Sequence, residues 1–289
     1  MGNIGDKKRI HEVNMLLEKE DEIALRTRLH LLEDRESQKT ERLMEKVLGM
    51  LGETQLPDGS WEKTIYKTLP NLHLLVDIRQ ENSALFQRGF EWILSLKGPL
   101  GFHEYWEEGM TIHGRDVNCP YGRRLGTPEF SGRVLHLLGR IGYEGPVVDE
   151  TIYNVMQYQR YDGGFHGPRF WEEDRRSCPG ATLWVTRGLL SLGREEDAVE
   201  KALSWVEREE VEDTPYQYST SALALETLYL HSTQETDCVK RHIEYLLSLR
   251  DDGQWAFGSY NETRRQLRAN VYKVLNAIQK FRPQILERL

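Results

Sequence analysis

The chain has 289 residues, and its 46 Asp and Glu outnumber its 38 Lys and Arg to give a net charge of -8. An acidic chain without a basic tract repels phosphate backbones, which excludes nucleic acid as a partner. Its apolar runs are shorter than the roughly 18 residues of a membrane span, and its first residues, MGNIGDKKRIHEVN, lack the apolar core of a secretory signal. We therefore expect a cytoplasmic protein with no transmembrane segment.

The beginning of the chain predicts a helical extension. Residues 6–33 are polar and charged and predict one helix, and we assign residues 1–35 to an N-terminal extension that packs on the main domain. Residues 36–289 are predicted to form a single domain, because one structural pattern recurs through most of them.

The recurring pattern is an apolar helical segment that ends in a Gly-aromatic turn. It occurs at residues 44–61, 90–102, 153–165 and 243–255, with the aromatic residues Trp61, Phe102, Phe165 and Trp255. Glycine supplies the positive φ of a tight turn, and the aromatic side chain is expected to fill the space between neighbouring helices.

A second set of helices alternates with the first. Their predicted starts lie near Pro70, Pro128, Pro179 and Pro215, because proline suits the first helical position, where its missing N–H is not needed. These helices are apolar or small nearly all round, which is typical of helices enclosed by protein, whereas the first set is amphipathic. The sequence therefore predicts an all-α toroid, with an inner ring wrapped by an outer ring, about five helix pairs and no β-sheet of consequence.

The turns also carry a family resemblance. The segments YQRYDGGF (158–165) and SLRDDGQW (248–255) resemble the QW-type prenyltransferase and squalene-oxidase repeat of terpene cyclases and protein prenyltransferase β-subunits. The resemblance covers residues 44–281 and implies an α/α toroid. It also implies a central, partly apolar cavity where the turns and the inner-helix N-termini meet, with an apolar small molecule as the partner.

The reaction motifs of those families are missing from this chain. No D-x-D-D sequence occurs, although class II terpene cyclases use that motif for protonation. The Asp-x-Cys zinc motif of the prenyltransferase β-subunits is missing too, since Val117 and Asn118 precede Cys119, and Arg176 and Ser177 precede Cys178. The resemblance thus implies a fold and a ligand class without a known reaction.

One sequence motif occurs twice, and it suggests a metal site. Gly-Phe-His, Trp-Glu-Glu and Cys-Pro follow in that order within residues 101–120 and again within 163–180. Equivalent loops of neighbouring repeats lie side by side in a toroid, so two imidazoles and two thiolates can converge on one tetrahedral zinc ion. The predicted ligands are His103, Cys119, His166 and Cys178.

A structural interpretation of the doubled motif stays open. The spacings of 16 and 12 residues from each His to its Cys differ from the tight C-x2-C pairing that identifies zinc sites from sequence. Cys178 can equally be a small residue at a helix N-cap, and Cys238, on an outer helix, is interpreted as packing alone. Three cysteines do not make a disulfide framework.

Acidic and aromatic clusters give the remaining candidates. Carboxylates beside an apolar cavity can act as general acids, and aromatic faces can stabilise a carbocation, although a solvated charged loop is the alternative. The predicted catalytic residues are Glu107, Glu108, Glu172, Glu173 and Asp174. The predicted ligand-binding residues are Trp106, Trp171, Trp184, His73, Arg175 and Arg176, the arginines either pairing with those carboxylates or binding an anionic group. His136 also lies in an inner helix, where a buried histidine with a backbone partner is the simpler interpretation.

Three functions remain open from the sequence. The first is an enzyme that acts on an isoprenoid or another apolar small molecule in a central cavity, with zinc or a carboxylate as the electrophile. The second is a non-catalytic toroid that binds a hydrophobic molecule. The third is a repeat scaffold that binds a protein partner or forms an oligomer. We favour the first, because the doubled His and Cys pattern is not needed for a scaffold.

Overall fold

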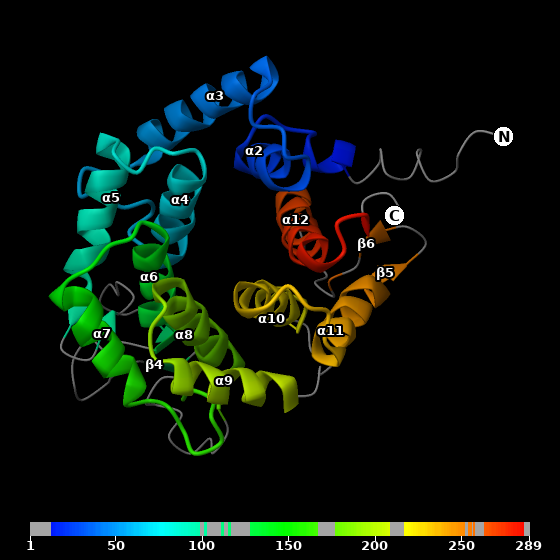
Figure 1. The fold of residues 1–289 in the computed structure, drawn as a ribbon. Coiled ribbons are helices and arrows are strands. Elements are labelled where there is room, and N and C mark those ends of the chain that lie inside the picture. Colours follow the sequence, from blue (N-terminus) through cyan, green and yellow to red (C-terminus); the bar gives the residue numbers. More distant parts are fainter. Residues whose placement is uncertain are drawn as a thin grey trace. The chain divides into compact units, whose positions relative to one another are not determined.

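The structure is a computed structural model. It describes residues 13–98, 101–102, 111–112, 115–116, 128–166, 177–208, 217–251, 254–255, 257 and 263–285. Within those ranges the protein is helical, and its strands are two residues long and pair only as small antiparallel hairpins. Figure 1 shows these helices and hairpins along the chain.

The helices and strands have the following bounds. The helical elements are α2 (Glu22–Arg26), the π-helix η1 (Thr27–Leu31), α3 (Gln38–Thr54), α4 (Ile65–Asp77), α5 (Ala84–Ser95), α6 (Pro128–Arg140), α7 (Pro146–Met156), α8 (Pro179–Leu192), α9 (Glu196–Arg208), α10 (Gln217–His231), α11 (Asp237–Ser248) and α12 (Arg264–Phe281). The strands are β1 (Lys97–Gly98), β2 (Gly101–Phe102), β3 (Thr111–Ile112), β4 (Arg115–Asp116), β5 (Arg250–Asp251) and β6 (Gln254–Trp255).

The chain divides into two compact units. The first contains Met1–Met50 together with Glu207–Leu289, and the second contains Leu51–Val206. The predicted boundary at residue 35 between an extension and a single domain stays a prediction.

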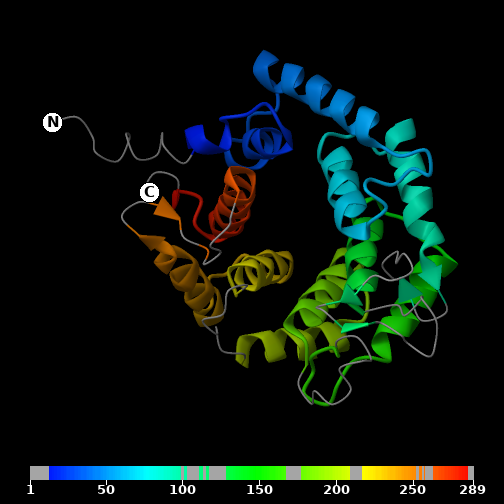
Figure 2. The same cartoon turned by 180° about the vertical axis from the view of Figure 1, so that it is seen from behind.

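The second unit is built from two rows of helices. Figures 1 and 2 show α4, α6 and α8 in one row, with α5, α7 and α9 alongside in the other. α4 contacts α5 and α6, and α6 contacts α7 and α8. The row of α4, α6 and α8 consists of helices that the sequence assigned to the inner ring, and their alternation with amphipathic helices explains the two-row packing.

Glycines let α6 and α8 approach closely. A Cβ atom added to Gly132 would lie 2.5 Å from the backbone of Trp184 and Val185, and one added to Gly139 would lie 2.6 Å from the backbone of Ser191. On α8, a Cβ at Gly188 would lie 2.7 Å from the carbonyl oxygen of Gly132. Real Cβ atoms do not come so close, so this helix pair requires glycine at these positions.

The Gly-aromatic turns are confirmed as structural. Trp61, Phe102, Phe165 and Trp255 are all buried. In three of these turns the aromatic residue donates its backbone N–H to a hydroxyl group of the helix that follows. The acceptors are Thr68 of α4 for Trp61 (3.0 Å), Ser131 of α6 for Phe102 (3.0 Å) and Thr182 of α8 for Phe165 (2.8 Å).

In two of the turns, a glutamine side chain bonds both the turn glycine and a residue of a neighbouring helix. Gln55 donates its side-chain amide to the carbonyl oxygens of Gly59, at 2.9 Å, and Leu85, at 2.8 Å. Gly59 has φ +91°, and a Cβ there would meet the carbonyl oxygen of Arg88 at 2.3 Å, so only glycine fits. The third repeat has the same arrangement, with Gln159 donating to Gly163 and Ala198.

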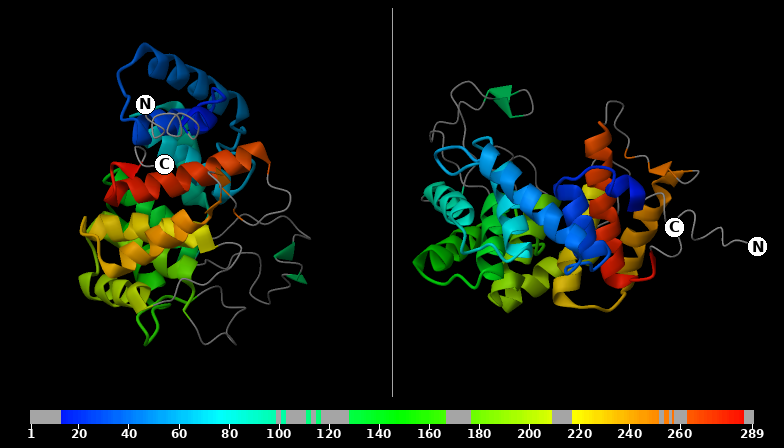
Figure 3. Two further views of the ribbon diagram at one scale, coloured as in Figure 1. Left: turned by 90° about the vertical axis from the view of Figure 1, so that its right-hand side faces the viewer. Right: turned by 90° about the horizontal axis from the view of Figure 1, so that it is seen from above.

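In the first unit, a buried arginine ties the N-terminal segment to α12. Arg268 is fully buried and donates to the carboxylate of Asp21, at 2.6 and 3.0 Å, and to the carbonyl oxygens of Met15 and Leu16. α10 packs against α11 and α12 in the same unit, as Figure 3 also shows.

Two expectations about helix ends are wrong. α4 begins at Ile65, five residues before Pro70, because Thr64 caps it by accepting a hydrogen bond from the N–H of Tyr66. The predicted N-terminal helix over residues 6–33 is interrupted at residues 17–21, where the chain turns before Asp21 caps α2. α6 and α8 do begin at Pro128 and Pro179.

Candidate functional site

One face of the row α4, α6 and α8 collects charged, aromatic and histidine side chains. Within each helix these residues recur at spacings of three, four or seven, which place them on one side. We call this surface the arginine face. It consists of Tyr66, His73 and Asp77 on α4, Glu129, Arg133, His136 and Arg140 on α6, and Trp184, Arg187 and Ser191 on α8.

At one end of the arginine face, a guanidinium group lies between two aromatic rings. The guanidinium carbon of Arg133 is 4.2 Å from the ring centre of Trp184 and 5.2 Å from that of Tyr66. Glu129, one turn earlier, accepts hydrogen bonds from Nε and one Nη of Arg133 at 3.1 and 2.7 Å. A carboxylate and two aromatic rings thus fix the position of the Arg133 guanidinium group.

Further along α6, two histidines lie beside each other. The ring centres of His73 and His136 are 5.1 Å apart. Arg140 donates to Nδ1 of His73 at 3.0 Å and to the carboxylate of Asp77 at 2.6 Å. Because arginine has only donors, Nδ1 of His73 accepts this bond and carries no proton.

The hydrogen bonds of His136 define its tautomer. Nε of Arg187 donates to Nε2 of His136 at 3.1 Å, so that nitrogen accepts. Nδ1 therefore carries the proton and donates to Oγ of Ser191 at 2.6 Å, while Ser191 donates to the carbonyl oxygen of Arg187 at 2.8 Å. This buried histidine uses side-chain partners where the sequence favoured a backbone partner.

The arginine face is partly exposed. The side chains of Arg133, Glu129 and Arg140 are 23%, 28% and 29% exposed, and Tyr66 is 51% exposed as a residue. Asp77 is more enclosed, with its side chain 8% exposed. The face carries three arginines and two carboxylates.

The sequence identified two members of this face. His73 and Trp184, both predicted to bind ligand, lie on it, the first beside His136 and the second beneath Arg133. The other predicted ligand-binding and catalytic residues lie outside the described residues. They are Trp106, Trp171, Arg175, Arg176, Glu107, Glu108, Glu172, Glu173 and Asp174.

Two of the four predicted metal ligands can be placed. The backbone N–H of Cys178 donates to the carbonyl oxygen of Phe165 at 2.8 Å, which brings Cys178 next to the strand bridge that precedes His166. Cys178 is the N-cap of α8, and its thiol makes no capping hydrogen bond. Among the described residues no group of three or more metal-binding side chains occurs. His103 and Cys119 lie outside those residues, so the four-ligand site stays a prediction.

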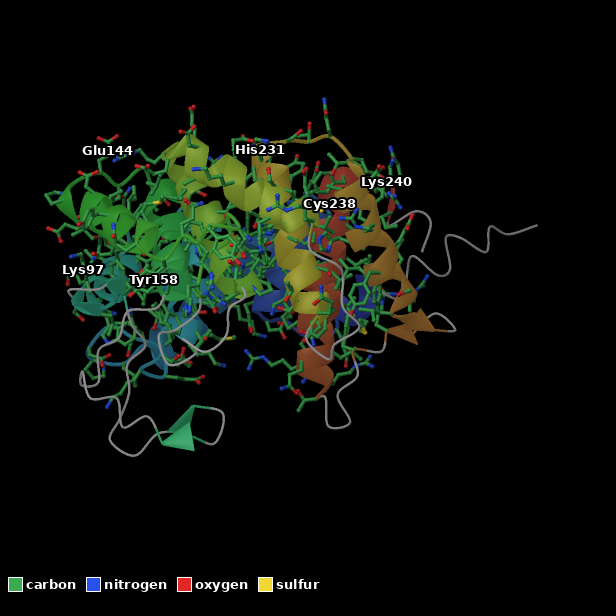
Figure 4. The ribbon with its side chains drawn as sticks, turned by 90° about the horizontal axis from the view of Figure 1, so that it is seen from below. Lys97, Glu144, Tyr158, His231, Cys238 and Lys240 are labelled. Carbon is green, nitrogen blue, oxygen red and sulfur yellow. The ribbon has the colours of Figure 1, made fainter. Side chains whose placement is uncertain are left out.

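The third cysteine lies in a different setting. Cys238 lies on α11, where Figure 4 labels it, and it is buried. Burial raises the pKa of its thiol, with the positive charge of Arg241 acting in the opposite direction. A buried thiol that keeps its proton is a packing residue, as the sequence indicated.

The sequence did not identify the arginines of this face, nor Tyr66, Asp77, Glu129 and Ser191. The one local signal was the Glu129-Arg133 spacing of four on a predicted helix, which identifies an ion pair and no more. The interactions with His73, His136 and Trp184 join residues of different helices, and spacing along the chain does not predict such contacts.

The described helices include none that is both long and apolar enough to cross a bilayer. No protein-family profile matches the sequence. No curated protein sequence matches it either.

Solved structures, in contrast, share the fold. A variant of the type II terpene cyclase MstE from Scytonema, in complex with the product merosterolic acid A, superposes with a TM-score of 0.63 at 14% identity, covering 96% of this chain and 98% of that one. A second MstE variant, in complex with the substrate geranylgeranyl dihydroxybenzoate, gives 0.61 at 15% identity, covering 96% and 88%. A protein from Actinoplanes gives 0.63 at 14% identity, covering 96% and 99%. The predicted fold class, an all-α toroid of the terpene cyclase type, is confirmed.

Proposed function

We propose that this protein binds an isoprenoid or a similar apolar small molecule, in the manner of a terpene cyclase-like fold, and that the arginine face forms part of the binding site. The observation that carries the proposal is the shared fold over 96% of the chain with structures that hold a geranylgeranyl substrate and a terpenoid product. Fold alone does not define a reaction, so the residues must supply the rest.

The arginine face supports this proposal through its composition. Its aromatic rings, Tyr66 and Trp184, offer apolar area, and its arginines offer hydrogen-bond donors that fix orientation. Small-molecule sites combine these two elements, a largely apolar wall and a few placed polar groups. Tyr66 is 51% exposed and the Arg133 side chain is 23% exposed, so both offer surface to a ligand.

Catalysis is a further part of the proposal. The chain has no D-x-D-D motif, so protonation of an alkene requires another acid, and Glu107, Glu108, Glu172, Glu173 and Asp174 stay the predicted candidates. Zinc held by His103, Cys119, His166 and Cys178 would supply a Lewis acid or a structural link between two repeats. The backbone bond from Cys178 to Phe165, the residue before His166, supports such a ligand set, because it brings these two candidate ligands to neighbouring places.

The binding proposal is tested by titrating the protein with geranylgeraniol and following tryptophan fluorescence and calorimetric heat. We expect saturable binding with one ligand per chain and a negative heat-capacity change, because apolar surface leaves water. The Trp184→Ala variant should bind more weakly, whereas Trp205→Phe, which alters a buried tryptophan of α9, is the matched control. Failure of geranylgeraniol to bind saturably would contradict the proposal.

A further inference from the structure

The contact between α10 and α11 differs from the contact between α4 and α5 at one position. Ser83 caps α5 by accepting a hydrogen bond from the N–H of Phe86, and Thr236 caps α11 in the same way. Counted from these caps, the sixth residue is Gly89 in α5 and His242 in α11, and both are buried. The same position therefore has no side chain in one helix and an imidazole in the other.

In α5, the glycine makes room for an aromatic ring. A Cβ atom added to Gly89 would lie 2.8 Å from the ring of Trp61 and 3.0 Å from Leu72 of α4. Trp61 donates its backbone N–H to the buried hydroxyl of Thr68 on α4, and its indole N–H to the carbonyl oxygen of Leu51, both at 3.0 Å. A ring that carries no charge thus contacts both α4 and α5.

In α11, the histidine side chain takes the place of such a ring. Nδ1 of His242 lies 3.1 Å from Oγ of Ser221 on α10, a hydroxyl that is fully buried, like that of Thr68 on α4. An aromatic ring packed on position 242 as Trp61 packs on Gly89 would collide with the imidazole. His242 itself therefore joins α11 to α10.

The imidazole differs from the indole because it can bind a proton. His242 is 6% exposed, and burial, with the charge of Arg241 acting in the same direction, lowers its pKa to about 4. Arg241 donates to the carbonyl oxygen of Glu207 at 2.7 Å, which holds this positive charge beside α11. A proton on His242 would thus create a buried charge next to a like charge.

The elements packed on α11 bring few other charges. The described side chains of α10 and β5 that carry or change charge between pH 4 and 8 are Glu226, His231 and Arg250. Glu226 accepts a hydrogen bond from Asn276 of α12 at 3.0 Å, on a different side of α10 from Ser221. His231 is exposed at the end of α10, where Figure 4 labels it. Neither position offers His242 a carboxylate partner in place of water.

We propose that the contact between α10 and α11 is an acid-sensitive joint, in which a neutral His242 holds α11 on α10 and a protonated His242 releases it. In the released state the imidazolium reaches water, which removes the cost of burying its charge. The ring of Trp61 does not titrate, so the contact between α4 and α5 lacks this device. The joint lies in the first unit and does not depend on a ligand at the arginine face.

Hydrogen exchange of the full chain, followed by mass spectrometry at pH 7, 6 and 5, tests the joint. Protection factors are corrected for the intrinsic exchange rate at each pH. We expect the protection of residues 237–248 to fall about twentyfold from pH 7 to pH 5, because the open state binds a proton near pH 6.5 and the closed state near pH 4. α12, in the same unit, should lose less than about threefold.

Variants assign the fall to His242. His242→Phe places a ring without a titrating group at this position, and Ser221 can then bond a carbonyl oxygen of its own helix, as Thr227 bonds Leu223. Protection of α11 should then change less than about threefold between pH 7 and pH 5. His242→Gln is a second variant with the same expectation. His231→Gln is the matched control and should keep the twentyfold fall, about as in the wild type.

Three results would overturn the proposal. The first is a wild-type α11 whose protection is the same at pH 7 and pH 5. The second is an equal fall in α11 and α12, because the unit would then unfold as a whole and not at a joint. The third is a wild-type fall that persists in a folded His242 variant, with folding verified by circular dichroism. The comparison of α11 with α12 needs no variant, so it decides the question even if neither variant folds.

Discussion

His242 should make the protein lose stability as the pH falls below 6.5. This histidine of α11 is 6% exposed, and Oγ of Ser221 on α10 lies 3.1 Å from its Nδ1. Burial, with the nearby charge of Arg241 acting in the same direction, lowers its pKa from 6.5 to about 4. In the unfolded chain the imidazole is expected to titrate at its ordinary value.

The sign and the size follow from proton linkage. Between pH 6.5 and 4 the unfolded state binds a proton that the native state does not, so the free energy of unfolding rises with pH in this window. Stability from this group is therefore complete above pH 6.5 and is lost as the pH falls toward 4. From pH 7 to pH 4.5 the loss amounts to about 2.5 kcal/mol, at ~1.4 kcal/mol for each unit of pKa difference.

Urea unfolding at pH 7, 6, 5 and 4.5, followed by circular dichroism, measures this loss. The His242→Asn variant keeps a polar atom near Ser221 but has no titrating group, so its stability should fall by about 2.5 kcal/mol less than that of the wild type over the same range. Any cost of the substitution at pH 7 cancels in this comparison. Equal pH dependence in the two proteins would refute the reasoning.

The remaining predictions concern packing, a buried ion pair and metal. Gly132→Ala should destabilise the protein by about 1–3 kcal/mol, because its Cβ meets the α8 backbone. Gly49→Ala, in open space on α3, should instead stabilise the protein by about 0.5–1 kcal/mol. Urea unfolding midpoints measure both changes, and equal effects of the two substitutions would contradict the close packing of α6 on α8. Arg268→Met should cost about 3–5 kcal/mol by leaving the Asp21 carboxylate and two carbonyls without their donor, and the exposed Arg265→Met should cost less than about 1 kcal/mol. If the zinc hypothesis is right, elemental analysis of protein purified without chelators should find about one zinc per chain. The Cys178→Ser variant should lose this zinc, and the Cys238→Ser variant should keep it. Wild-type protein without metal would contradict the hypothesis.

The fold could be predicted because its signals are local and repeated. The turns at Trp61, Phe102, Phe165 and Trp255 each combine glycine with an aromatic residue, and all four aromatic side chains are buried as expected. The alternation of helix types predicted the two rows of the second unit. The resemblance to terpene cyclase repeats was carried by those same turns, in which the glutamine and glycine of one repeat recur in another.

The error at Pro70 has a physical cause. Proline is common at the first helical position, and Pro128 and Pro179 follow that rule. In α4 the stronger signal was Thr64, whose hydroxyl accepts from the N–H of Tyr66 and starts the helix earlier. Pro70 then lies inside the helix, at the cost of one backbone hydrogen bond.

The site was only partly predictable, because its contacts join distant parts of the chain. The hydrogen bonds of His136 and His73 connect residues 51 to 67 positions apart. Sequence spacing identified the helices and the candidate ligand-binding residues His73 and Trp184. It did not identify Arg140 and Arg133, which contact these two side chains. Arginine on an apolar helix is usually interpreted as solvated, and only the packing of α4, α6 and α8 shows that Arg133 lies between two rings.

Photo-crosslinking with a diazirine-bearing geranylgeranyl probe tests the central claim most directly. If the proposed function holds, peptides that contain 65–77, 128–140 or 179–192 will be labelled, and an excess of unlabelled geranylgeraniol will remove the label. Labelling that geranylgeraniol does not remove, or that falls only on other segments, would contradict the claim that the arginine face forms part of an isoprenoid-binding site.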